Sequence, residues 1–78
     1  MRWGEMGRTR NQLRKIRRAH GITQEKLEAA SRVKQTTISA IELTGRRPRV
    51  DTAIRIARGL TKLSGRRYAV EDVFQVGD

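Results

Sequence analysis

The stretch QEKLEAASRVKQTTISAIEL, residues 24–43, decides the fold of this chain. Thr23, just before it, is a good N-cap, because a threonine hydroxyl accepts a hydrogen bond from a free backbone N–H of the first helical turn. A further helix is expected at about Gln35–Leu43, where Ile38 and Ile41 fall three residues apart and so share one buried face. The stretch therefore predicts two short helices joined by a turn of about three residues.

Apolar residues at helical spacing predict helices on both sides of this stretch. One helix is expected from near Thr9, since Thr9 and Gln12 match the T-x-x-Q capping box. The most periodic helix is expected at about Val50–Leu63. Its expected apolar face consists of Val50, Ala53, Ile54, Ala57 and Leu60. A short last helix is expected at Val70–Phe74, so the pattern predicts an all-α domain of five helices.

Length and composition narrow the function classes. The 78 residues leave room for one domain, which we expect at 9–78 behind a flexible N-terminal arm at 1–8. There is no cysteine and a single histidine, His20, and no nucleophile and base pair or phosphate-cradling glycine loop is found. We therefore expect no enzyme activity, no metal and no cofactor. The chain also lacks a long apolar run and a secretory signal, which predicts a cytoplasmic protein without a membrane partner.

The charge balance favours a polyanionic partner. Lysine and arginine total 18 against 8 aspartate and glutamate residues, a formal net charge of +10. Binding to phosphates releases counterions, which makes association with such a chain favourable. The same excess also fits an arginine-rich solvated surface, and charge alone does not separate DNA from RNA or from an anionic membrane. Two short helices and a turn in a basic domain are typical of a helix-turn-helix, which lays its second helix in the DNA major groove.

Three stretches carry a resemblance to a known family. They are GITQEKL at 21–27, VKQTTISAIE at 33–42 and the Gly-Arg-Arg-Pro loop at 45–48, in order and without gaps through Leu60. The ending VEDVF at 70–74 is similar to that family as well. The chain resembles the phage Cro and CI repressor-like helix-turn-helix proteins, also called the XRE family. This resemblance implies a lambda-repressor-like DNA-binding domain.

The resemblance also implies roles for individual residues. The implied base contacts are Gln35, Thr36 and Ala40. The implied contacts to the DNA backbone are Gln24, Lys34, Thr37, Arg46, Arg47 and Arg49. Chemistry agrees, since a glutamine can bond adenine N6 and N7, and threonine and alanine methyls can pack on the thymine methyl. Glu42 is implied to pair with Arg17 and so to tie the motif to the scaffold.

The chain departs from the family pattern at several positions. Glu28 stands where a small residue is usual, and Arg32 stands where the turn usually has glycine. Lys34 and Arg49 replace the usual serine N-caps of the helices that follow them. Extra residues, Thr61–Tyr68, separate the last two helices. These departures bear on the geometry of the turn and on the dimer surface.

The leading hypothesis is a transcriptional regulator of phage or prokaryotic repressor type. It would bind a double-stranded DNA operator as a homodimer, with the dimer contact made by the C-terminal segment. A second hypothesis is the DNA-binding antitoxin of a toxin–antitoxin pair, whose toxin would bind Thr61–Asp78. A third is a phage protein that binds host RNA polymerase and uses the fold as a scaffold. The second and third hypotheses add a protein partner.

Overall fold

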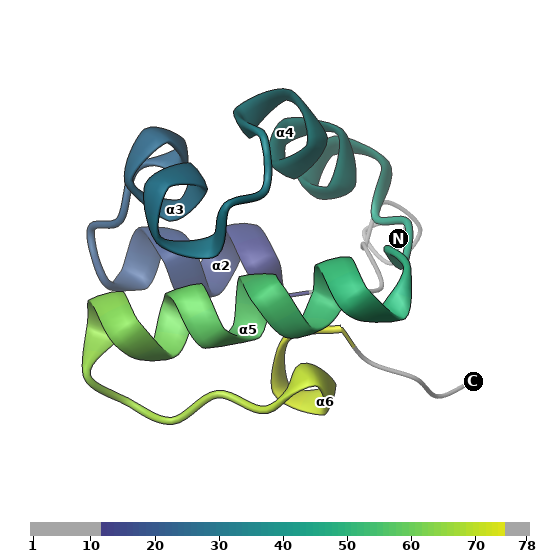
Figure 1. Ribbon diagram of the computed structural model, residues 1–78. Coiled ribbons are helices and arrows are strands. Elements are labelled where there is room, and N and C mark those ends of the chain that lie inside the picture. The colour runs from purple at the N-terminus through teal and green to yellow at the C-terminus, as the bar shows by residue number, and fades with distance from the viewer. Residues whose placement is uncertain (1–11, 75–78) are drawn as a thin grey trace, which may run out of the picture.

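The computed structural model describes residues 12–74, and all five regular elements in this range are α-helices (Figure 1). They are α2 (Leu13–Ala19), α3 (Gln24–Ser31), α4 (Gln35–Thr44), α5 (Val50–Ser64) and α6 (Val70–Val73). The predicted all-α class and the two short helices at residues 24–43 are confirmed. The predicted arm at 1–8 and Thr9 of the predicted capping box lie outside the described residues.

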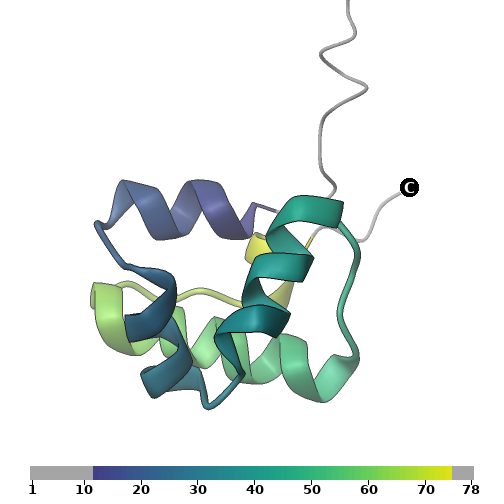
Figure 2. The ribbon, with the colours of Figure 1, turned by 90° about the horizontal axis from the view of Figure 1, so that it is seen from above.

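The helices surround one apolar core. In Figure 1, α3 and α4 lie on one side of α5 and α6 lies on the other. Seen from above, α2 and α5 form opposite sides of the described part, and α3 and α4 lie across them (Figure 2). The core consists of Leu13, Ile22, Leu27, Val33, Ile38, Ile41, Ala53, Ile56, Leu60, Val73 and Phe74. Among the described helices, none is long and apolar enough to cross a membrane.

Local signals begin and end the two central helices. The Thr23 hydroxyl accepts a hydrogen bond from the Lys26 backbone N–H at 3.0 Å, so the predicted N-cap of α3 is confirmed. Gly45 ends α4 with φ at +71°, a left-handed conformation that glycine adopts without steric cost. The helix α4 therefore ends after ten residues, and a helix of this length can place its first turns in a groove about 12 Å wide.

The predicted apolar face of α5 is wrong at two positions. Val50 and Ile54 are exposed, at 74% and 38%, whereas Ile56, which was not predicted to face the core, is fully buried. The helix is turned toward α3, which it approaches closely at Gly59. A Cβ at Gly59 would lie 3.0 Å from the Cβ of Ser31. The contact with α3 therefore sets the rotation of α5, and that contact is not visible in the periodicity of α5 alone.

The extra residues Thr61–Tyr68 extend α5 and then lead back to α6. The Tyr68 backbone N–H donates a hydrogen bond to the Thr61 hydroxyl oxygen at 2.9 Å. The Tyr68 hydroxyl lies 2.7 Å from Nε2 of His20, and the two rings meet edge to face. The insertion is thus held to both α5 and the end of α2.

Arg32, which stands where the turn usually has glycine, has a left-handed conformation with φ at 63°. A side chain costs about 1–2 kcal/mol in this region, which glycine avoids at an entropic cost of about 0.5–1 kcal/mol. Arg32→Gly should therefore raise the free energy of unfolding by about 0.5–1 kcal/mol in urea titrations. The control Arg32→Ala keeps a Cβ and should show no such gain. An equal gain in both variants would mean that the arginine side chain, and not the backbone, is unfavourable.

Candidate nucleic-acid interface

One face of α4 is free for a ligand. Ile38 and Ile41 are buried, which confirms their predicted orientation. Thr36 and Ala40, one turn apart, are exposed on the opposite side of the helix. Leu43, one turn further, continues this face and is 75% exposed. Sequence reasoning missed Leu43, although its spacing of three residues from Ala40 was a signal that could have found it.

Gln35 sits at the edge of this face and is half-buried. Its side-chain amide donates a hydrogen bond from Nε2 to the side-chain oxygen Oε1 of Gln24 at 3.4 Å. The Gln24 amide in turn donates to Oε1 of Glu42 at 3.1 Å. This chain of contacts joins the first turns of α3 and α4. It orients the amide of Gln35 while one face of α4 stays open beside it.

Glu42 of α4 connects the helix pair α3 and α4 to α2. Arg17 of α2 donates to both of its carboxylate oxygens, from Nε at 2.7 Å and from Nη2 at 3.0 Å. The side chains are only 4% exposed for Glu42 and 13% for Arg17. The third guanidinium nitrogen, Nη1, donates to the Ile22 carbonyl oxygen at 2.9 Å. A bidentate pair of this kind has a defined geometry, so it sets the position of α4 relative to α2.

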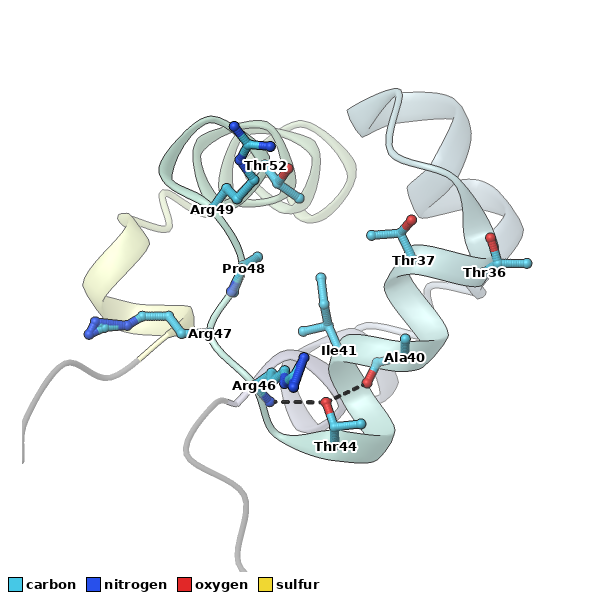
Figure 3. Close-up of a pocket in the computed structure, with 10 residues that line it drawn as sticks. All are labelled: Thr36, Thr37, Ala40, Ile41, Thr44, Arg46, Arg47, Pro48, Arg49 and Thr52. Atoms are coloured by element: carbon cyan, nitrogen blue, oxygen red, sulfur yellow. Dashed lines mark hydrogen bonds between the residues drawn. The ribbon is translucent and has the colours of Figure 1, made fainter.

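A groove of about 460 Å³ separates α4 from the loop that follows it (Figure 3). It is lined by Thr36, Thr37, Ala40, Ile41, Thr44, Arg46, Arg47, Pro48, Arg49 and Thr52. The Thr44 hydroxyl accepts from the Arg46 backbone N–H at 3.2 Å and donates to the Ala40 carbonyl oxygen at 2.8 Å, which holds the start of the loop against α4. Arg47 is among the lining residues, and Figure 3 shows its side chain pointing away from α4.

Exposed cations lie at both ends of α4. Lys34 precedes the helix, and Arg46, Arg47 and Arg49 follow it, all of them exposed. The residues that line the groove include three arginines and no acidic residue. Glu42, the acid of α4, is buried in its ion pair. The surface around the free face of α4 is therefore positive and suits a polyanion.

A helix-turn-helix family model matches residues 13–63, more than half of the chain. The match covers α2, α3 and α4 and nearly all of α5. It therefore includes the free face of α4 and the loop that lines the groove. A search of curated proteins and a search of solved structures gave no match.

Proposed function

The chain belongs to the Cro/CI-like helix-turn-helix family of DNA-binding proteins, and from this premise we propose that it is a sequence-specific transcriptional regulator of the repressor type. The observation that carries the proposal is the orientation of α4. Ile38 and Ile41 are buried while Thr36 and Ala40 face outward. An amphipathic helix oriented in this way can enter the major groove with its first turns at the base edges.

Gln35, Thr36 and Ala40 read bases in this proposal. The amide of Gln35 would bond N6 and N7 of an adenine, and its contact with Gln24 supports this role by restricting its rotamers. The methyl groups of Thr36 and Ala40 would pack on thymine methyls. Exposure of both residues on one helical face supports their access to the same groove.

A second set of residues would hold the sugar-phosphate backbone. It consists of Gln24, Lys34, Thr37, Arg46, Arg47 and Arg49. These residues lie at the first turn of α3, around α4 and in the loop after it. Contacts of this kind set the register of a protein on the duplex and carry no sequence information.

We further propose that two copies bind one operator, with half-sites about 34 Å apart. A single module of this size makes few base contacts, so a second copy would supply the specific affinity. The C-terminal segment is the proposed dimer contact. The position of α6 supports this proposal, because α6 lies on the other side of α5 from α3 and α4 (Figure 1). A dimer contact at α6 would therefore leave α4 free.

In vitro selection from a random duplex library tests the proposal. The full chain should enrich one sequence, arranged as two-fold related half-sites if two copies bind. The double variant Gln35→Ala with Thr36→Ala should enrich a different or a weaker consensus. A library that stays random after repeated rounds with the unmodified chain would overturn the assignment as a sequence-specific regulator.

Replacing Arg49 with alanine should weaken binding to specific and random duplexes alike. Loss of one phosphate contact should lower the slope of log K against log salt by about 0.9. The slope can be measured by fluorescence anisotropy between about 50 and 200 mM salt. Arg18→Ala, on the exposed side of α2, removes the same charge and should change the slope much less. Equal slopes for Arg49→Ala and the unmodified chain would remove Arg49 from the backbone-contacting set.

A further inference from the structure

One exposed side chain on the free face of α4 has no part in the proposed function. Leu43 is 75% exposed, and no other large apolar side chain of residues 12–74 is more exposed. A single exposed leucine is ordinary on a protein surface, so the position of Leu43 carries the argument. In a helix of about 3.6 residues per turn, Thr36, Ala40 and Leu43 lie within roughly 60° of one another. Leu43 therefore belongs to the face that we propose to enter the major groove.

The free face of α4 lies between two hollows of the surface. A hollow of about 150 Å³ lies on one flank, where Leu43 and Ser39 line it together with Arg14 of α2 and Gln24 of α3. The larger groove of Figure 3 lies on the other flank, where Thr44 lines it. Leu43 thus projects from the helix at the edge of the smaller hollow, accessible to a ligand that covers the free face.

The fold does not require a leucine at this position. Glutamine, glutamate, lysine and arginine form helices nearly as well, so helix propensity does not explain an exposed leucine. A second copy of the chain is not the occupant, because a contact between two such faces would cover Thr36 and Ala40 and close the proposed DNA site. Protein partners bury clusters of aromatic and other large anchors, whereas Thr36 and Ala40, beside Leu43, are small.

We infer that Leu43 is a further specificity-determining residue, which packs on the C5-methyl group of a thymine. A leucine side chain has no hydrogen-bond donor or acceptor, so it cannot bond a phosphate or a polar base edge. The apolar group that base pairs present in the major groove is the thymine methyl.

The place of Leu43 along α4 fits this contact. The helical rise puts it about 10 Å beyond Thr36, roughly three base-pair steps of 3.4 Å. The N-terminal end of a recognition helix leads into the groove, so the third turn lies farther from the bases than the first turn. A leucine side chain reaches farther than threonine or alanine, and it can span that extra distance.

Removal of single methyl groups from the DNA tests this inference, which rests on the proposed function for its operator. Each thymine of the selected operator is replaced in turn by deoxyuridine, which pairs in the same way and lacks only the C5-methyl group. At one thymine the replacement should weaken binding of the unmodified chain about fourfold, the effect of one buried methyl group. The same replacement should leave binding of Leu43→Ala almost unchanged, because alanine does not reach the methyl. Competition measured by fluorescence anisotropy gives both values.

Two further variants serve as controls. Leu43→Met keeps an apolar side chain of similar reach and should keep the deoxyuridine effect. Val50→Ala shortens an apolar residue of nearly equal exposure, 74%, at the start of α5, and it should keep the effect as well. Leu43→Ala should fold, since the leucine is exposed and alanine is the best helix former. Thermal melting by circular dichroism checks this.

The outcomes separate this inference from the proposed function. Deoxyuridine effects that are the same for Leu43→Ala and the unmodified chain at every thymine would overturn the inference alone. Equal weakening of selected and random duplexes by Leu43→Ala would also overturn it and would place the leucine at the DNA backbone. Loss of self-association in sedimentation, with the deoxyuridine effects unchanged, would place it in a protein contact instead. A selection that yields no consensus sequence would overturn the proposed function, and the inference with it.

Discussion

Replacing Glu42 with glutamine should lower the free energy of unfolding by about 2–4 kcal/mol, because it leaves the Arg17 guanidinium without a counter-charge in a largely buried place. Both carboxylate oxygens accept hydrogen bonds from Arg17, at 2.7 and 3.0 Å. A glutamine amide would direct N–H groups toward one of these arginine donors or toward the amide of Gln24, which donates to the same carboxylate. Urea titrations of the full chain give the change directly.

A double-mutant cycle shows whether this loss comes from the ion pair. Arg17→Met combined with Glu42→Met replaces both charges with apolar side chains of similar length, which often costs little when a buried pair is removed as a unit. The double variant should therefore be more stable than either single variant. Strictly additive losses would show that the two charges stabilise the fold independently, and that the pair does not fix α4 on α2.

The ends of the helices could be predicted because short-range chemistry sets them. The Thr23 cap depends on a hydroxyl and an N–H three residues away in the chain. Arg32 stands where the turn usually has glycine, and its φ of 63° is the left-handed conformation that glycine adopts without steric cost. Such features depend on residues that are close together in the sequence, so the sequence pattern alone is enough to predict them.

The rotation of α5 could not be predicted from its own pattern. Val50 and Ile54 extend an apparent apolar face, but α3 approaches at Gly59 and turns the helix so that Ile56 is buried instead. The close contact needs a glycine on one helix and the small residue Ser31 on the other. These two positions are far apart in the chain, and only the folded structure brings them together.

The sequence predicted which face of α4 is exposed in the candidate site, but it did not predict the contacts between its side chains. The exposure of Thr36 and Ala40 follows from the burial of Ile38 and Ile41 on the other side of α4. The direction of the Arg47 side chain, away from α4, depends on the path of the loop in space. The link between the amides of two glutamines joins separate helices, so the linear pattern did not indicate it.

The second large effect is expected at Gln35, whose side-chain amide contacts that of Gln24. Gln35→Ala should relax the preference at one base pair of the selected operator and reduce specific binding by about 1–3 kcal/mol, roughly 5- to 150-fold. Random duplexes should lose much less, because the backbone contacts remain. Competition binding with the selected operator and with single-base variants measures both quantities.

A second variant tests the contact between the two amides. If Gln24→Ala lowers discrimination at the same base pair, then the 3.4 Å contact between the two amides positions Gln35. Equal losses on selected and random DNA for Gln35→Ala would show that this residue does not read a base.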